Sequence, residues 1–409
     1  MMSKEKRRVP KLRFPGFTEE WEQYRFNNLL KKNLERNDGK FNSNKTISIA
    51  RMKYNKLGNG ASDESLNNYK VLRFGDVAFE GHENKEFKFG RFVMNDIGDG
   101  IMSPRFTALR PIKVLEVEFW KEYINYEPIM QKKLVNSTKK GTMMHELVVD
   151  EFLKQEILLP SKEEQQKIGR LLKLQSNIIN LHQRKVEHLI LKKKALLQKL
   201  FPRNGNRYPE FRFPGFTAPW EQRKLSEFVD KAVDNRGKTP PLDENGAHPL
   251  IEVAALGGVY PDYSKVEKYL SDDVFNTNLR AYIKKDDILF TTVGSIGLVS
   301  LMDSREEAAI AQNIVAFRAK ENFLPEYLYA LFSNEDNQYK AKRIAMVAVQ
   351  PSIKVSQLVN VEYMISTNIE EQERIGVFFS SLQSLITLHQ RKLEHLQIQK
   401  KSLLQQLFV

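Results

Sequence analysis

A long internal repeat is the feature that most constrains how this chain can fold. The motif RFPGFT, followed by WEQ, begins at Arg13 and returns at Arg212. A longer stretch, Glu164 to Phe201, aligns without a gap with Glu371 to Phe408. The two repeats are offset by 199 and 207 residues, far more than the period of a solenoid. The chain is therefore two copies of one plan, each with an arm, a variable region and a conserved stretch.

Both conserved stretches carry apolar residues at alternating steps of three and four, the spacing of a coiled-coil seam. The predicted seam comprises Leu172, Ile179, Val186, Leu189, Leu196 and Leu200 in the first stretch and Phe379, Leu382, Ile386, Leu393, Leu396, Leu403 and Leu407 in the second. Leu171, Leu174, Ile178 and Leu181 would widen the first stripe. Packed on each other as an antiparallel coiled coil, the two helices would give the molecule pseudo-two-fold symmetry. Two amphipathic helices in separate cores are the alternative.

Polar residues also fall at positions of the predicted seam. They are Gln175 in the first stretch and two pairs related by the repeat, His182 with His389 and Lys193 with Lys400. Such residues either fix the register at a cost in stability or lie where the seam is solvated, with the lysines extending into water. The basic run 192–194 is interpreted as a solvated helix face, with contact to DNA phosphates as the alternative.

The repeats divide the chain into segments. The predicted boundaries are an arm at 1–23, a first variable domain at 24–157, a conserved helix at 158–201, a linker and repeated arm at 202–222, a second variable domain at 223–364 and a C-terminal helix at 365–409. Short apolar runs between turn residues indicate mixed α/β structure in both variable domains. The expected fold class is α+β, with the two domains joined by two long helices packed as an antiparallel coiled coil.

Net charge limits the class of partner. The chain has 64 Lys and Arg against 51 Asp and Glu, a formal charge of +13, which favours a polyanion such as nucleic acid or an anionic membrane. No apolar run approaches the roughly 18 residues of a membrane span, and no secretory signal is recognisable. The absence of cysteine excludes thiolate metal sites and fits a cytoplasmic protein. Nucleic acid is the expected partner, and no metal site is predicted.

The order of the motifs resembles the specificity subunit of type I restriction–modification systems. The similarity spans essentially the whole chain. In the first half it rests on the F-P-x-F arm with W-E-Q, on Gly75-Asp76 before an apolar run, and on Leu159-Pro160 before Glu164 to Ile168. In the second half it rests on Arg236 to Pro240, the Gly294-Ser295-Ile296-Gly297 turn, Gln312 to Ile314 and Gln350 to Ile353. The first domain departs from this pattern, with 79–84 in place of the glycine turn and Ser103-Pro104 in place of Gln312-Asn313. Near the last helix, Ser366-Thr367 replaces the proline found at Pro160.

The resemblance implies a double-stranded DNA-binding subunit with two target-recognition domains, each reading one half of a bipartite site. It also implies association with two methyltransferase subunits that carry S-adenosylmethionine, and with restriction and translocase subunits that use ATP. No cofactor and no catalytic residue is expected in this chain. Its single Pro-Pro, Pro240-Pro241, lacks the flanking residues of an adenine methyltransferase loop, and no phosphate-binding loop is present.

Candidate DNA contacts follow from residue type, because base edges and phosphates are bound by Arg, Lys, Asn, Gln, Ser and Thr. The candidates are Lys45, Arg51, Lys53, Tyr54, Asn55, Lys56 and Arg105 in the first domain and Arg236, Lys238, Thr239, Thr292, Ser295, Gln312, Asn313 and Gln350 in the second. For each one, a solvated loop or a hydrogen-bonded strand end is the competing interpretation. Two other functions are possible: a stand-alone DNA-binding regulator, or a coiled-coil scaffold that would leave the charge unexplained.

Overall fold

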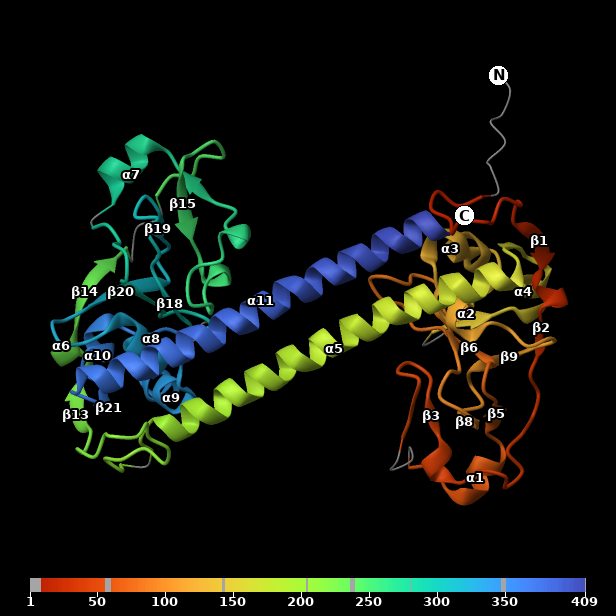
Figure 1. Cartoon of the computed structure of the whole chain (residues 1–409), viewed down its shortest axis with the longest axis horizontal. Helices are drawn as coiled ribbons and strands as arrows, with labels where there is room; N and C mark the ends of the chain where they lie inside the picture. The colour runs from red at the N-terminus through yellow and green to blue at the C-terminus, as the bar shows by residue number, and fades with distance from the viewer. Residues whose placement is uncertain are drawn as a thin grey trace. The chain divides into compact units, whose positions relative to one another are not determined.

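The computed structural model describes residues 9–55, 60–141, 144–203, 205–235, 240–279, 281–346 and 351–408. It forms two compact units (Figure 1). Unit 1 comprises the residues up to 181 together with those from 394 onward, and unit 2 comprises residues 182–393. Each unit therefore contains one variable domain, the arm that precedes it, and part of each of the two long helices.

Unit 1 is built around a small antiparallel sheet. Its elements before the long helix are β1 (Glu22–Arg25), η1 (Phe26–Asn28), β2 (Leu30–Lys32), η2 (Ser43–Lys45), β3 (Ile47–Ser48), β4 (Lys53–Tyr54), α1 (Asp63–Asn67), β5 (Lys70–Leu72), β6 (Val77–Glu80), β7 (Arg91–Met94), β8 (Gly100–Met102), β9 (Thr107–Pro111), α2 (Val117–Tyr123), α3 (Glu127–Val135), β10 (Thr138–Lys140), β11 (His145–Leu147), α4 (Val149–Lys154) and β12 (Glu156–Leu159). The main sheet has the order β2-β9-β6-β7, and β1 pairs with β12. Because β12 leads directly into the long helix, this last pair joins the start of the domain to its end.

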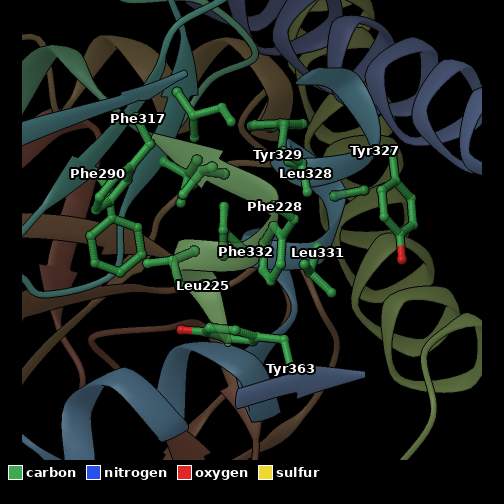
Figure 2. Close-up of a cluster of buried hydrophobic side chains, with 14 of the residues drawn as sticks. Leu225, Phe228, Phe290, Phe317, Tyr327, Leu328, Tyr329, Leu331, Phe332 and Tyr363 are labelled. Atoms are coloured by element: carbon green, nitrogen blue, oxygen red, sulfur yellow. The ribbon is translucent and has the colours of Figure 1, made fainter. Parts of the chain in front are cut away.

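Unit 2 repeats this plan with a larger core. Its elements between the long helices are β13 (Glu221–Lys224), α6 (Leu225–Phe228), β14 (Val229–Asp234), β15 (His248–Ile251), η3 (Val253–Ala255), η4 (Tyr263–Lys265), β16 (Tyr269–Leu270), α7 (Asp272–Asn278), β17 (Ile288–Thr291), β18 (Val299–Leu301), β19 (Ala309–Ile310), β20 (Ile314–Ala319), α8 (Pro325–Ser333), α9 (Glu335–Arg343), α10 (Val355–Leu358) and β21 (Glu362–Ile365). The main sheet has the order β14-β20-β17-β18, and β13 pairs with β21 as β1 does with β12. Helix α8 is buried from Tyr327 to Phe332, as expected for a helix that is apolar on every face. Figure 2 shows its side chains among those of Phe228, Phe290 and Tyr363.

The same aspartate-centred corner precedes the main sheet strand in both units. In unit 1 the Asp76 carboxylate accepts from the Arg73 amide at 2.8 Å and pairs with Arg110 at 2.8 Å. In unit 2 Asp287 accepts from the Lys284 amide at 2.8 Å and pairs with Arg318 at 2.7 Å. Each aspartate is almost fully buried, so removing its arginine would leave an uncompensated charge in the core. The acidic residue of this repeated motif is thus structural.

The long helices are α5 (Lys162–Leu200) and α11 (Ile369–Leu407), each of 39 residues. They pair in antiparallel fashion within each unit. In unit 1 the Gln175 side chain donates to the Leu396 carbonyl at 3.1 Å, and in unit 2 Lys193 donates to Gln383 at 2.7 Å. All thirteen predicted seam residues are buried or half-buried. The coiled-coil prediction is therefore confirmed, and separate packing of the two helices is wrong.

The apolar stripe on helix α5 is narrower than the sequence predicts. Leu171 and Ile178 are half-buried, but Leu174 and Leu181 are 59% and 63% exposed. An antiparallel partner covers only the seam positions, because residues on the outer faces of a two-helix pair have nothing to pack against. These two leucines therefore remain on the surface of unit 1.

The polar seam residues contact each other or the adjoining domain. The Nδ1 atoms of His182 and His389 lie 3.4 Å apart in unit 2, so one imidazole can donate to the other. Burial lowers the pKa of Lys193 to about 8. Its repeat equivalent, Lys400, forms an ion pair with Glu122 at 2.8 Å in unit 1. Both lysines thus bond to other side chains, as a register-fixing role requires.

Each long helix ends in a domain core with a repeated phenylalanine. Phe408 packs against Phe119, Tyr123 and Tyr126 in unit 1, and Phe201 packs against Trp220 in unit 2. Helix α11 thereby completes the core of the domain that lies first in the sequence, and α5 completes the core of the second.

The arms dock on the starts of the long helices through buried, bidentate ion pairs. Arg13 donates twice to Glu164 in α5, both at 2.8 Å. Arg212 donates twice to Glu371 in α11, at 2.7 and 2.9 Å. Within the described residues, the structure contains no helix of the length and apolarity that crossing a membrane would require.

Candidate nucleic-acid interface

A hairpin in unit 1 presents most of the first-domain candidates. Strands β3 and β4 pair through Ile47 with Tyr54 and Ser48 with Lys53. At the tip, Met52 is buried with φ of 44°, while Arg51 and Lys53 on either side are exposed. A non-glycine residue in this left-handed conformation needs support from its surroundings. The apolar pocket around Met52 supplies it, and both cations are directed outward.

Hydrogen bonds from other strands hold the hairpin in place. The Arg91 guanidinium in β7 donates to the Ala50 carbonyl at 2.7 Å, and the Tyr54 hydroxyl donates to the Asp99 carbonyl at 2.9 Å. Lys45 places its ammonium 4.6 Å from the centre of the Tyr54 ring. Tyr54 is thus half-buried and tied to the fold, whereas Arg51 and Lys53 are free to reach a ligand.

The remaining first-domain candidates are more scattered. Asn55 donates its amide to the Thr46 carbonyl at 2.8 Å and closes the base of the same hairpin. Arg105 is exposed on a separate turn before β9, with its guanidinium 5.7 Å from the centre of the Phe106 ring. Lys56 lies outside the described residues. The structure thus brings together Lys45, Arg51, Lys53, Tyr54 and Asn55, while Arg105 stands apart.

In unit 2 the glycine turn between β17 and β18 carries one of the candidates, Ser295. Ser295 is exposed at its tip, and the Ser295 carbonyl accepts from the Thr291 hydroxyl at 2.5 Å. Gly297 has φ of 90°, which favours glycine. The turn borders a cavity of about 500 Å³ that is also lined by Gln338 and Lys342 of α9. Lys342 was not among the sequence candidates, because only the fold brings α9 to the turn.

The other second-domain candidates differ in accessibility. Gln312 is exposed and Asn313 is half-buried. Thr292 is fully buried, and its amide and hydroxyl both donate to the Asn313 carbonyl, at 2.9 and 3.3 Å. In the free protein Thr292 therefore supports the loop. Arg236, Lys238, Thr239 and Gln350 lie outside the described residues, and DNA contact by any of these candidates stays a prediction.

A carboxylate–arginine network in unit 1 lies beside this surface. Glu35 accepts from Arg73 at 2.7 Å and from Arg110 at 2.8 Å. The hydrogen bond from Arg73, together with that from Arg110, lowers the pKa of Glu35 to about 2. Arg73 also pairs with Asp99 at 2.7 Å. Both arginines are paired with these carboxylates, whereas Arg51 and Lys53 of the hairpin form no ion pair in the described part of the chain. Within the described ranges, no group of three or more His, Cys, Asp or Glu side chains could hold a metal ion.

Comparison with known proteins shows the family to which this chain belongs. The model of the type I restriction modification DNA specificity domain matches twice, at residues 18–190 and 218–397. The two matches together span most of the chain, so the protein belongs to the type I restriction–modification DNA specificity family. It is a specificity subunit with two recognition domains.

Curated relatives and solved structures agree with this assignment. The chain is 25% identical over 292 residues to the type I restriction enzyme MjaVIII specificity subunit of Methanocaldococcus jannaschii, covering 69% of this chain and 68% of that protein. It is 21% identical over 381 residues to the putative MjaX specificity subunit of the same organism, covering 88% and 84%.

Two solved structures share the fold. One is the S subunit of a type I restriction–modification system from M. genitalium, with a TM-score of 0.58, 13% identity and coverage of 98% and 99%. The other comes from work on complex assembly and conformational transition of the type I R-M system, with a TM-score of 0.52, 18% identity and coverage of 97% and 98%.

Proposed function

We propose that this chain selects the DNA site for a type I restriction–modification complex and itself neither methylates nor cuts DNA. Each recognition domain reads one half of a bipartite double-stranded site. The observation that carries this proposal is the duplication. Two domains of the same plan present different loops, the β3–β4 hairpin in one and the turn between β17 and β18 in the other, as expected for reading different sequences.

Two methyltransferase subunits would dock on the long helices, one for each unit. Unit 1 exposes Leu181 of α5 and Ile398 of α11, at 63% and 68%. Unit 2 exposes the repeat equivalents, Leu388 of α11 and Leu191 of α5, at 63% and 66%. Large apolar side chains repeated on otherwise polar helices favour a helical protein partner. S-adenosylmethionine and ATP would be bound by the methyltransferase and restriction subunits.

Exchange of one recognition domain tests the proposal. Residues 223–364 are replaced by the corresponding segment of a relative, and methylated adenines are mapped across the genome of a cell that supplies the partner subunits. We expect one half of the recognised site to change while the other half stays the same. A change in both halves, or in neither, would contradict two independent recognition domains.

Two further measurements test the absence of chemistry and the alternative function. The pure chain should transfer no methyl group and should bind S-adenosylmethionine no better than an unrelated protein. When recovered from its native cell, it should bring methyltransferase subunits with it. A stand-alone DNA-binding regulator would be recovered without them.

A further inference from the structure

A large cleft in unit 1 lies between the recognition domain and the two long helices. Its volume is about 1320 Å³. The domain side includes the hairpin residues Arg51 and Lys53, and the helix side includes Ile179 of α5 and Lys401 of α11. The DNA-reading candidates of the first domain therefore share a cleft with a lysine from the far end of the sequence, which no sequence motif singled out.

Half of the ten charged side chains that line this cleft are already in ion pairs. Lys121 forms an ion pair with Asp96, and Lys400 forms one with Glu122. The Arg91 guanidinium donates to a backbone carbonyl and lies 3.7 Å from the carboxylate of Glu80. These contacts neutralise the three cations and hold helix α11 against the domain.

Three cations remain: Arg51, Lys53 and Lys401. All three are exposed, and in the described part of the chain no carboxylate lies within ion-pair distance of any of them. The cleft also contains Glu86 and Glu127. The pKa of Glu127 is raised by burial and then by the charge of Glu86, and no cation opposes this shift. Neither glutamate forms an ion pair with any of the three cations in the described part of the chain, so each cation keeps its charged group available.

The repeat supplies an internal comparison for Lys401. Its equivalent in unit 2 is Lys194 of α5, which forms an ion pair with Glu335 of α9 at 3.0 Å. Unit 1 contains no such partner for Lys401 among its described residues. The same helical position is thus neutralised in one unit and free in the other, although the two helices align without a gap.

We infer that Lys401 of α11 binds the DNA backbone in this cleft together with Arg51 and Lys53. In unit 1 the helix then contributes directly to DNA binding, whereas in unit 2 the equivalent lysine does not. The ligand is a phosphate of duplex DNA, because three unpaired cations on two sides of an open cleft match a polyanionic backbone. Lysine and arginine bound to phosphates add affinity without adding sequence information. This inference rests on the proposed DNA-binding function.

The geometry favours a preformed contact. The Lys400–Glu122 pair attaches α11 to α2, and Phe408 anchors the end of the helix in the domain core. The hairpin opposite is held by Arg91 and Tyr54. Neither side of the cleft needs to rearrange before DNA binds, so little ordering entropy opposes the contact.

The test measures how binding to a labelled mixed-sequence duplex depends on salt, using the full-length chain. Each neutralised phosphate contributes about 0.9 to the slope of log affinity against log salt. We expect Lys401→Gln to reduce the slope by about 0.9 and the double variant Arg51→Gln/Lys53→Gln to reduce it by about 1.8. The matched control, Lys194→Gln, should leave the slope at the wild-type value. Thermal unfolding should be the same for all of these exposed-site variants.

The outcomes separate this inference from the proposed function. If wild-type protein binds with a steep salt dependence but Lys401→Gln and Lys194→Gln behave alike, the helix contact is wrong and the specificity function stands. If Lys401→Gln keeps the slope but recovers less methyltransferase, the cleft holds protein instead of DNA, and the inference is also wrong. If wild-type binding does not depend on salt, the DNA-binding function itself fails.

Discussion

Replacing Arg13 with alanine should destabilise unit 1 far more than replacing an arginine in a surface ion pair. Arg13 makes two hydrogen bonds of 2.8 Å to Glu164, whose side chain is 1% exposed. The substitution leaves that carboxylate buried in the first turn of α5. Its amide, which donates to Ser161 Oγ at 3.3 Å, would stay bonded, but among the described residues Arg13 is the cation that pairs with its side chain.

The magnitude follows from the burial of the two partners. Removing one partner of a buried ion pair costs about 3–5 kcal/mol. Two features place the cost near the lower limit. The Arg13 side chain is 14% exposed, so water enters when it is removed, and the N-terminus of a helix stabilises a nearby anion by about 0.3–1 kcal/mol. We therefore expect a loss of about 3 kcal/mol in the free energy of unfolding of unit 1.

Tryptophan fluorescence gives the assay. The chain has three tryptophans, of which Trp21 and Trp120 are in the core of unit 1 and Trp220 is in the core of unit 2. In a Trp220→Phe background, denaturant unfolding followed by fluorescence reports unit 1 alone. Arg13→Ala is compared with its parent in that background.

Two further variants test whether the buried charge of Glu164 causes the loss of stability in Arg13→Ala. Arg25 pairs with Glu156 at 3.5 Å, and their side chains are 64% and 45% exposed, so Arg25→Ala should cost less than about 1 kcal/mol. Replacing both Arg13 and Glu164 with methionine should recover most of the loss, because no buried charge remains. Equal costs for Arg13→Ala and Arg25→Ala, or no recovery in the double variant, would refute this account of the arm.

Three further predictions concern the ion pairs of Glu35, the histidine contact in the helix seam and the anchoring of Phe408 in a domain core. Glu35→Gln should cost about 2 kcal/mol at neutral pH, allowing for partial exposure, because the lowered pKa of Glu35 means that its ionised form stabilises the fold. This stabilisation is fully present above the pKa of Glu35 in the unfolded chain, near 4.5, and is lost as the pH falls through the folded pKa of about 2. The urea midpoints of Glu35→Gln and of the wild type should therefore converge near pH 2. Replacing both His182 and His389 with leucine should raise the melting temperature by the equivalent of about 1 kcal/mol, since apolar seam residues gain burial; a lower melting temperature would mean that the imidazole contact stabilises the helix pair. Phe408→Ala should cost about 3–5 kcal/mol in unit 1, read by the tryptophan fluorescence of that unit, and a loss below about 1 kcal/mol would show that the helix end is not part of that core.

The helical part of the fold was predictable because its signal is local. A heptad repeat is set by residues three and four apart, so the seam from Leu172 to Leu200 could be read from the sequence directly. Leu174 and Leu181 fit the apolar pattern yet lie on the surface, because the width of a buried stripe depends on what covers it. The insertion of Phe201 and Phe408 into domain cores was also out of reach, since it depends on contacts between distant segments.

The candidate site was predictable only where its residues are contiguous. Arg51, Lys53 and Tyr54 are neighbours in sequence, and a hairpin keeps them together. Thr292 fits the composition of a base-reading loop, yet its hydroxyl is bonded to a backbone carbonyl in the interior. Lys401 carries no distinguishing sequence signal, because its equivalent Lys194 is also a lysine in the same helical frame and differs in having a carboxylate nearby. Charge pairing of this kind is a property of the folded surface.

The bond between the first arm and the last helix has a consequence for how such a chain can be encoded. The Leu12 amide donates to the Gln406 carbonyl at 2.9 Å in unit 1, and the Phe211 amide donates to the Lys199 carbonyl at 2.9 Å in unit 2. In unit 2 the peptide chain runs from helix to arm within a dozen residues, whereas in unit 1 the same contact forms between residues at opposite ends of the sequence. Side-chain and backbone packing therefore holds an arm against a helix end even where no short stretch of chain connects the two. A circularly permuted gene that starts in the linker after Phe201, and joins Phe408 to the first arm by a copy of that linker, should preserve every contact described above. The order of the two halves along the gene is then free to change without loss of the fold.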